Sequence, residues 1–338
     1  MSNIVETLPA HWYHSDEIFE REKRQIFSRY WSYVGWVGHL VQEGQYLTTD
    51  IAGQSVVVVN AGQGRLFGFL NLCRHRASPV CLENQGQVSR FTCPYHAWTY
   101  GLDGALLAAP GFGDELDTAS NGLLPVRVDT WRGLVFACLD ESAEELDAWM
   151  GEVNDIADKY PDLSEFEYET MRSNPCDANW KNYSDNSAEG YHLGTIHPDL
   201  SASLVRSQTR IAAYDNGSFV GFNVSYREEE GESPGFWIYK FPGLLMHYSM
   251  NSFNIEKVTP VSACSSRMER WFWFRPEVDA VTRAQTIEFS NQIMEEDMGI
   301  CARVQRNLES GNYDKGYLSR EREPGTVYFQ SCVREALQ

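Results

Sequence analysis

The sequence is short of basic residues and has no long apolar run. Its 28 Lys and Arg residues stand against 47 Asp and Glu residues, and the formal net charge is −19. This surplus argues against nucleic acid or an anionic membrane as a partner, because like charges repel. No uncharged apolar stretch approaches the roughly 20 residues that cross a bilayer. The first residues lack the pattern of a signal peptide, and we expect a cytoplasmic protein.

The chain also lacks internal repeats, low-complexity linkers and a convincing nucleotide-binding motif. Gly62-Gln63-Gly64 lies between two strand-like runs with no helix after it, and therefore predicts a hairpin turn and not a dinucleotide loop. In a reducing cytoplasm the eight cysteines are expected to be metal ligands or buried residues, not disulfides.

The pattern of apolar residues predicts an α+β fold. The length of 338 residues, with 43% hydrophobic content, suits two domains. Near-helical spacing predicts an amphipathic helix within residues 16–31, and β-branched runs broken by glycine predict antiparallel strands from about residue 46 to 140. The acidic run at 228–232 is expected to be a solvated loop. We expect a helical segment at 1–40 that packs on the last domain, a β domain at 41–150, and a domain of mixed structure at 151–338.

Two Cys/His pairs lie close together in the predicted β domain. Cys73-x-His75 and Cys93-x-x-His96 supply two thiolates and two imidazoles. Two sulfurs on one iron and two imidazoles on the other are the ligands of a Rieske [2Fe-2S] cluster, and this segment resembles that arrangement. The rival is a zinc site, but zinc sites usually begin with a Cys-x-x-Cys pair. Cys81 lies off the pattern and is expected to be a small buried residue.

A second constellation follows in the run NWKNYSDNSAEGYHLGTIHP. On a helix, Asp185, Glu189 and His192 would share one face. For His197 to meet the same ion as His192, the helix must end or distort near Gly194, and Pro198 fits such a stop. Two histidines and one carboxylate with open positions are typical of a mononuclear Fe(II) oxygenase, and the carboxylate must come from elsewhere in the chain.

These motifs resemble the α subunit of the Rieske non-haem iron oxygenases over nearly the whole chain. The resemblance rests on the two Cys/His pairs, on Asn179-Trp180-Lys181 leading into Asp185-Asn186, and on Glu189 before Tyr191-His192 and His197. It implies an N-terminal Rieske domain and a C-terminal helix-grip catalytic domain with an antiparallel sheet. Ala77 stands where the family often has Gly, and Asp185 where Glu is frequent.

The resemblance also implies roles for particular residues. Asp297 would be the third iron ligand, with Glu295 and Glu296 as the competing carboxylates. In this family the subunits form head-to-tail trimers, and an acidic residue bridges a cluster histidine of one subunit and an iron histidine of its neighbour. Glu189 takes that position here, between His96 and His192. Asp185 and Asn186 would support the ligands.

The implied function is O2-dependent hydroxylation with a [2Fe-2S] cluster and mononuclear Fe(II) as cofactors. Without a flavin or nicotinamide motif, or a plant-type ferredoxin cysteine set, the electrons must come from a separate NAD(P)H-dependent reductase. The spacing of Asn186 and Glu189 resembles the branch that acts on quaternary ammonium compounds, and so favours N-demethylation of a methylated amine. The alternatives are aromatic ring hydroxylation, a pure Rieske electron carrier and a zinc-stabilised binding protein.

The C-terminal half is rich in aromatic residues, which allow two interpretations. The runs GFWIYKFPGLLMHYSM and ERWFWFRP could supply an aromatic cage for a methylated ammonium group. They also alternate like strands that form an ordinary sheet core.

Overall fold

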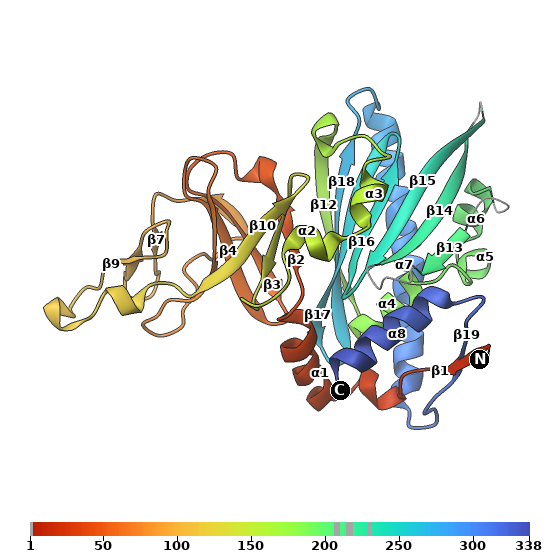
Figure 1. Cartoon of the computed structure of the whole chain (residues 1–338), viewed down its shortest axis with the longest axis horizontal. Helices are drawn as coiled ribbons and strands as arrows, with labels where there is room; N and C mark the ends of the chain where they lie inside the picture. Colours follow the sequence, from red (N-terminus) through yellow and green to blue (C-terminus); the bar gives the residue numbers. More distant parts are fainter. Residues whose placement is uncertain (1–2, 206–209, 214–218, 229–230) are drawn as a thin grey trace. The chain divides into compact units, whose positions relative to one another are not determined.

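In the computed structural model the backbone is described for residues 3–205, 210–213, 219–228 and 231–338. The chain divides into two compact units, Phe27–Trp149 and a unit made of Met1–Ile26 with Met150–Gln338 (Figure 1). We call the first the insertion unit, because it interrupts the sequence of the second, and we call the second the two-segment unit. Among the described residues, no helix is long and apolar enough to cross a membrane.

The insertion unit consists of two antiparallel sheets. The larger has the order β2-β11-β10-β5-β4-β3-β6, and the smaller has the order β7-β8-β9. The predicted hairpin at Gly62-Gln63-Gly64 is confirmed, since Asn60 at the end of β4 pairs with Leu66 at the start of β5. The strands are β2 (Ser32–Trp36), β3 (Gln45–Ile51), β4 (Gln54–Asn60), β5 (Leu66–Leu70), β6 (Gln85–Gln87), β7 (Phe91–Thr92), β8 (Thr99–Tyr100), β9 (Leu106–Ala108), β10 (Pro125–Trp131) and β11 (Leu134–Cys138).

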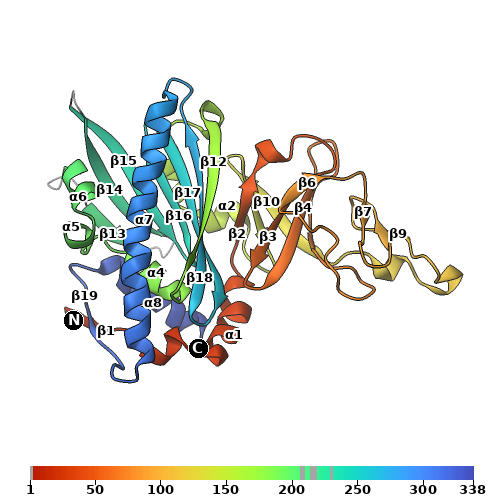
Figure 2. The same cartoon turned by 180° about the vertical axis from the view of Figure 1, so that it is seen from behind.

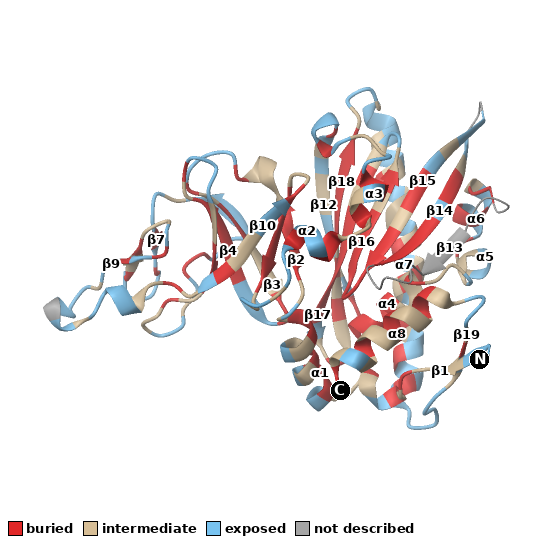
Figure 3. Ribbon diagram, viewed as in Figure 1, coloured by how far each residue is buried: buried red, intermediate tan, exposed pale blue. Residues whose placement is uncertain are grey.

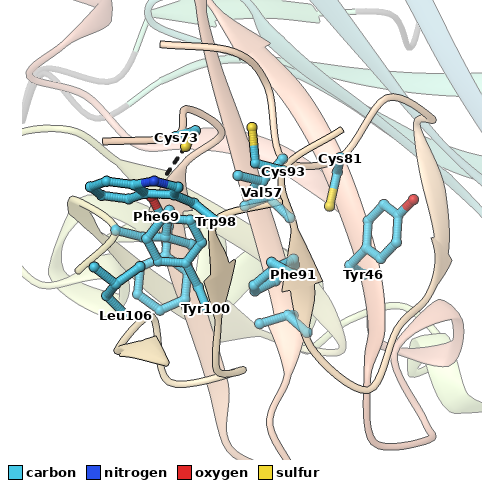
Figure 4. Close-up of a cluster of buried hydrophobic side chains, with 13 residues drawn as sticks. Tyr46, Val57, Phe69, Cys73, Cys81, Phe91, Cys93, Trp98, Tyr100 and Leu106 are labelled. Atoms are coloured by element: carbon cyan, nitrogen blue, oxygen red, sulfur yellow. Dashed lines mark hydrogen bonds between the residues drawn. The ribbon is translucent and has the colours of Figure 1, made fainter. Parts of the chain in front are cut away.

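A buried apolar cluster lies beneath the loops that carry the two Cys/His pairs (Figure 4). Val57 and Val59 of β4 point into it, and Phe69, Phe91 and Tyr100 are also among its members. Because Cys73 and Cys93 belong to the same cluster, both cysteine loops rest on a close-packed base.

The two-segment unit is built on a seven-stranded antiparallel sheet covered by one long helix. The strand order is β12-β18-β17-β16-β15-β14-β13, and helix α7 (Ala280–Glu309) runs across the sheet (Figure 2). Buried residues line β15 to β18 (Figure 3), and Phe272 and Phe274 of β18 pack with Ile287 of α7. The strands are β12 (Glu167–Cys176), β13 (Arg210–Ala213), β14 (Val220–Glu228), β15 (Gly231–Lys240), β16 (Leu244–Ser249), β17 (Ser252–Ser262) and β18 (Ser265–Phe274).

Helices and short strands from both ends of the chain complete this unit. Strand β1, near the N-terminus, pairs with β19. The elements are β1 (Ile4–Glu6), α1 (Asp16–Glu22), α3 (Val153–Ala157), α4 (Trp180–Ser187), α5 (Leu193–Ile196), α6 (Pro198–Ser203), β19 (Tyr317–Ser319) and α8 (Pro324–Ala336), while α2 (Leu146–Met150) spans the boundary between the two units in the sequence.

The N-terminal helix is shorter than the apolar pattern predicts. Ser15 caps α1 by accepting a hydrogen bond from the Ile18 N–H, and α1 ends at Glu22, where a π-helical turn, Lys23–Phe27, follows. Glu22 is fully buried and pairs with Lys181 of α4, Nζ to Oε1 at 2.5 Å, while its Oε2 accepts a hydrogen bond from the Trp180 indole. The N-terminal segment is thereby joined to the helix that leads into the second motif.

Two expectations about boundaries need comment. The acidic run at 228–232 is not a loop where it is described: Glu228 ends β14 and pairs with Gly231, which begins β15, and residues 229–230 lie outside the described residues. The register of β14 and β15 explains the difference, because both strands extend through the described part of the acidic run. The expected domain limits at residues 40 and 150 stay a prediction.

Candidate functional site

The two Cys/His pairs of the insertion unit lie on two loops of similar form. The Ala77 N–H donates to the Cys73 carbonyl, and the Ala97 N–H donates in the same way to the Cys93 carbonyl. Ala77 and Ala97 both have positive φ, +56° and +59°, a region that glycine adopts without steric cost. The left-handed backbone at Ala77 gives a physical reason for the glycine that the family resemblance leads us to expect at this position.

These loops bring the four predicted ligands together. The rings of His75 and His96 have centroids 4.6 Å apart, and His75 stacks on Trp98 at 5.1 Å with an interplanar angle of 8°. The Tyr100 hydroxyl lies 3.3 Å from Sγ of Cys73 and accepts a hydrogen bond from the Arg74 N–H. The Tyr100 hydroxyl, which contacts Cys73, and Trp98, which stacks on His75, therefore hold the first pair in place.

The environment of the four side chains fits a metal cluster. Nδ1 of His75 is buried and has no hydrogen-bond partner among the described residues, as expected of a nitrogen that needs a ligand. Burial opposes ionisation of the Cys93 thiol, but the backbone N–H groups of Tyr95 and His96 and the side chains of Cys73 and Ser78 together lower its pKa. A thiolate is the form that binds metal.

Cys81 has a different environment. Its thiol points toward the ring of Tyr46, away from the other two cysteines (Figure 4). Burial raises the pKa of this thiol to about 12, so it remains protonated. This agrees with the expectation of a small buried residue.

In the two-segment unit, the second motif lies on α4 and on the break that follows it. Asn179 caps α4 by accepting a hydrogen bond from the Lys181 N–H. The expectation of a helix that continues to Gly194 is wrong, because α4 ends at Ser187 and only a short helix, α5, follows His192. The Ala188 carbonyl closes against Gly325 of α8, where even a Cβ would lie 1.9 Å from the oxygen. This close approach requires glycine and leaves no room for α4 to continue unchanged.

His192, His197 and Asp297 converge from three elements. His192 precedes α5, His197 lies between α5 and α6, and Asp297 is on α7. One ligand atom from each lies within 4.8 Å of the other two. Oδ1 of Asp297 is 2.9 Å from Nε2 of His197 and 3.6 Å from Nε2 of His192. Two imidazoles and one carboxylate at these separations fit a mononuclear iron.

Nδ1 of each histidine in this trio lies next to the carboxylate of a glutamate. Nδ1 of His192 lies 2.5 Å from Oε1 of Glu189, and Nδ1 of His197 lies 2.6 Å from Oε2 of Glu296. A carboxylate that accepts the Nδ1–H bond leaves Nε2 free for a metal and fixes the ring. Burial opposes protonation of His197, but Asp297 and Glu296 raise its pKa. Of the competing carboxylates, Glu296 thus contacts the far side of a histidine, and Glu295 is exposed.

Asp185 and Asn186 contact different parts of the site. Nδ2 of Asn186 donates to Oδ1 of Asp297 at 2.7 Å. Asp185 points the other way and accepts hydrogen bonds from the Tyr13 hydroxyl at 2.6 Å and from Gln330 at 2.9 Å. Desolvation raises the pKa of Asp185 to about 7, against the lowering effect of those two hydrogen bonds. Tyr191, which precedes His192 in the sequence, is largely exposed.

Gln305, two turns beyond Asp297 on α7, was not predicted to support the site. Its Oε1 accepts hydrogen bonds from the Asn179 N–H and from Nδ2 of Asn182, and its Nε2 donates to the Tyr13 carbonyl. It therefore sets the position of α7 against α4 and the N-terminal segment. The sequence shows only a glutamine eight residues after Asp297 in a long helical stretch, and its burial follows from the fold.

A cavity of about 550 Å³ opens beside the trio. It is enclosed by the sheet and α7, and His192, His197 and Asp297 are part of its lining. Phe222, Tyr226 and Trp237 form an aromatic wall of this cavity, and the Trp237 indole donates to the Tyr226 hydroxyl at 2.7 Å. Trp237 and Phe274 from the two aromatic runs line the cavity, while Trp273 is fully buried in the core. The runs thus supply both cavity wall and sheet core.

Comparison with known proteins places this fold and site in a family. Residues 157–338 match the family model for the ring hydroxylating alpha subunit (catalytic domain), and residues 31–124 match that for the Rieske [2Fe-2S] domain. The chain therefore belongs to the Rieske non-haem iron oxygenases, as an alpha subunit, and is an oxidoreductase with a [2Fe-2S] cluster and a mononuclear iron. The predicted α+β fold class is confirmed. The electron-carrier and zinc-protein alternatives are excluded by the catalytic domain.

Relatives of known activity resemble the chain at moderate identity. The glycine betaine monooxygenase oxygenase subunit of Chromohalobacter salexigens is 32% identical over 237 residues, which are 68% of this chain and 50% of that protein. The chain thus spans about half the length of this relative. The carnitine monooxygenase oxygenase subunit of Acinetobacter pittii is 28% identical, with 98% of this chain and 95% of that protein covered. A structure of the quaternary ammonium Rieske monooxygenase CntA has a TM-score of 0.91 at 26% identity, with 99% of this chain and 96% of that chain covered.

Proposed function

We propose that this chain is the terminal oxygenase of a reductase-dependent system that removes a methyl group from a quaternary ammonium compound or a related methylated amine. The observation that carries the proposal is the aromatic wall of Phe222, Tyr226 and Trp237 in the same cavity as His192, His197 and Asp297. Aromatic faces attract a methylated ammonium group, and the names of the relatives point to such substrates.

The proposed roles of the residues follow from their contacts. Cys73, Cys93, His75 and His96 would hold the cluster, and His192, His197 and Asp297 would hold the iron. When bound, the cluster would supply single electrons and the ferrous ion would activate dioxygen: two electrons and two protons convert one oxygen atom to water, and the other oxygen atom is inserted into a C–H bond of an N-methyl group. The N-hydroxymethyl ammonium product then loses formaldehyde and a proton and leaves the demethylated amine.

The remaining residues orient these ligands. Glu296 fixes the ring of His197, and Asn186 holds the carboxylate of Asp297. Glu189 contacts His192 in this chain and would bridge to His96 of a second copy in a homotrimer, so that electrons cross between subunits. Inter-subunit electron transfer is described for CntA. Asp185 would hold α4 in place through Tyr13 and Gln330.

The proposal extends to partners and organisation. The electrons would come from a separate NAD(P)H-dependent flavin or ferredoxin-type reductase, in the cytoplasm, where the free cysteines of the chain stay reduced. Residues 41–150 together with β2 would form the cluster domain, and residues 151–338 the iron domain, with residues 1–26 packed on the latter.

The test is substrate-dependent oxygen uptake with formaldehyde release, using anaerobically purified protein and a generic flavin/ferredoxin reductase pair. γ-Butyrobetaine and glycine betaine are compared with the isosteric tert-butyl carboxylates, in which carbon replaces the ammonium nitrogen. Uptake and formaldehyde with the ammonium compounds alone support the proposal. A response to neutral aromatic compounds, with none to ammonium compounds, would favour ring hydroxylation instead.

A further inference from the structure

The wall of the cavity changes from aromatic to charged across the sheet. Trp237 on β15 pairs with His247 on β16, which pairs with Asn254 on β17. Two residues after Asn254 on β17, Glu256 pairs with Arg270 on β18. All five side chains line the cavity. Because neighbouring strands are about 4.8 Å apart, the charged pair lies roughly 10 to 14 Å from Trp237 at the backbone, two to three strands away on the same sheet.

Arg270 is buried, with 3% of its surface exposed, yet it is incompletely paired. Its Nη1 donates to the Ser290 carbonyl on α7 at 2.6 Å. Its Nε is 3.4 Å from Oε2 of Glu256. Among the described residues, neither Nε nor Nη2 of Arg270, nor Oε1 of Glu256, has a partner in hydrogen-bonding geometry.

Two other ion pairs of the same unit are fully bonded. Arg283, outside the cavity, has all three nitrogens bonded, to Glu167, Glu169 and backbone carbonyls. In the fully buried pair of Glu22 and Lys181, both carboxylate oxygens have partners. Leaving a buried charged group without hydrogen bonds is costly, so the open donors of Arg270 call for a partner that is not part of the fold.

We propose that Arg270 binds the carboxylate of a zwitterionic trimethylammonium substrate, whose ammonium end lies between the aromatic wall and the iron ligands. This inference rests on the proposed function and narrows it from methylated amines to betaines. Glu256 holds the guanidinium in place, and its carboxylate offsets the positive charge of Arg270. The cavity therefore contains no fully uncompensated charge before a substrate binds, while the open donors of Arg270 can still bind a carboxylate.

The position of Arg270 suits an extended substrate. Ser290, which anchors the guanidinium, is seven residues before Asp297 on α7. At 1.5 Å per residue, this is roughly 10 Å along the helix. A substrate whose carboxylate binds Arg270 therefore needs a chain of several bonds between the carboxylate and the nitrogen for its N-methyl groups to reach the iron ligands. A compound with three methylenes between nitrogen and carboxylate, such as γ-butyrobetaine, has this form.

The experiment compares γ-butyrobetaine with its primary amide by calorimetry on the anaerobic holoenzyme. The two compounds share the trimethylammonium group and the chain length and differ only in the negative charge. A charge-assisted hydrogen bond predicts about 10- to 100-fold tighter binding of the carboxylate. Binding is measured without turnover, so electron supply does not affect the result.

Four variants test how each charged side chain contributes to the preference for the carboxylate, that is, to the ratio of the affinities for the carboxylate and the amide. Arg270→Met should reduce the preference for the carboxylate to about one by weakening that compound alone. Glu256→Gln should increase the preference, because a repelling charge is removed. Arg283→Met, which removes a fully bonded arginine outside the cavity, should leave the preference unchanged. If Arg270→Met does not fold, because Glu256 is left alone, the double variant Glu256→Gln with Arg270→Met removes both charges and should show no preference.

The outcomes distinguish the two proposals. Equal affinity of the wild type for both compounds, or an unchanged preference in Arg270→Met, overturns the role of Arg270 and leaves the proposed function intact. If neither compound binds and glycine betaine does not stimulate oxygen uptake either, the proposed function fails, and the inference fails with it. If only glycine betaine stimulates oxygen uptake, the role of Arg270 is overturned and the proposed function stands. A strong preference lost in Arg270→Met and increased in Glu256→Gln supports both.

Discussion

Oε2 of Glu296 lies 2.6 Å from Nδ1 of His197, on the side of the ring opposite Asp297. Glu296 and Asp297 are adjacent in sequence, yet one orients the histidine and the other faces its second nitrogen. The two carboxylates therefore hold the same imidazole from both sides, and only Nε2 remains available for a metal.

Glu296→Gln tests this arrangement. Loss of the charge behind the imidazole should weaken Fe(II) binding about 10- to 100-fold and leave the cluster spectrum unchanged, since the insertion unit is not altered. Fe(II) titration of the apo mononuclear site measures the change. Glu295→Gln, one residue away and exposed, is the matched control and should bind iron like the wild type. Equal affinity in both variants would show that Glu296 does not orient His197.

Glu189→Gln should separate metal loading from catalysis. The glutamine oxygen can still accept the hydrogen bond from Nδ1 of His192, so iron and cluster contents should remain at wild-type levels. The lost charge should slow product formation by at least about 10- to 100-fold. In a single-turnover experiment, the reduced cluster should then stay reduced in the presence of substrate and oxygen. Glu288→Gln, exposed on α7, is the control, and wild-type turnover in Glu189→Gln would refute the bridging role.

The buried pair of Glu22 and Lys181 should dominate the attachment of the N-terminal segment. Lys181→Met leaves a carboxylate buried without its cation and should lower the free energy of unfolding by about 3–5 kcal/mol. The double variant Glu22→Gln with Lys181→Met should lose much less, because no charge stays buried. Lys315→Met breaks the exposed pair with Glu6 and should cost at most about 1 kcal/mol. Urea denaturation followed by circular dichroism measures all three.

Asp185 should make stability depend on pH. Its pKa in the folded protein is raised to about 7 by desolvation, so the folded state holds a proton that the unfolded chain releases near pH 4. Stability from this group is therefore present below pH 4 and decreases as the pH rises toward 7, by about 2–4 kcal/mol. Asp185→Asn removes this dependence. The difference in thermal midpoint between the wild type and the variant should change over pH 4 to 7, and a constant difference would contradict the prediction.

Ala77→Gly should stabilise the insertion unit. The φ of +56° at Ala77 strains any residue with a Cβ by roughly 1–2 kcal/mol, and part of this is offset by the greater freedom of glycine in the unfolded chain. The expected net gain is about 0.5–1 kcal/mol. Ala109→Gly, at a position without positive φ, should instead destabilise the protein. Thermal unfolding monitored by the cluster absorbance measures both changes.

The sequence predicts the local parts of the site better than the distant ones. Cys73, His75, Cys93 and His96 lie within one segment, and their spacing alone indicates two neighbouring loops. The trio depends on Asp297, a hundred residues after His197, and only the family resemblance pointed to it. The role of Glu296 was not foreseen, since the face that α7 turns to the site is set by packing.

Packing between distant segments also explains the other differences. The helical spacing of Asp185, Glu189 and His192 favours a continuous helix, but α8 approaches through Gly325 and α4 ends at Ser187. Arg270 and Glu256 carry no sequence pattern that links them. They become neighbours only through the register of β17 and β18.

The two-segment construction has a consequence for how the catalytic half can be studied alone. A fragment that starts at Met150 would lack Tyr13, the partner of Asp185, and Glu22, the partner of Lys181. It would also leave β19 without the strand β1 that pairs with it. An autonomous catalytic fragment therefore requires residues 1–26 joined to residue 150 by a linker in place of the insertion unit. An exchange of the insertion unit between related proteins must therefore keep both points at which it joins the two-segment unit, at residues 26–27 and 149–150.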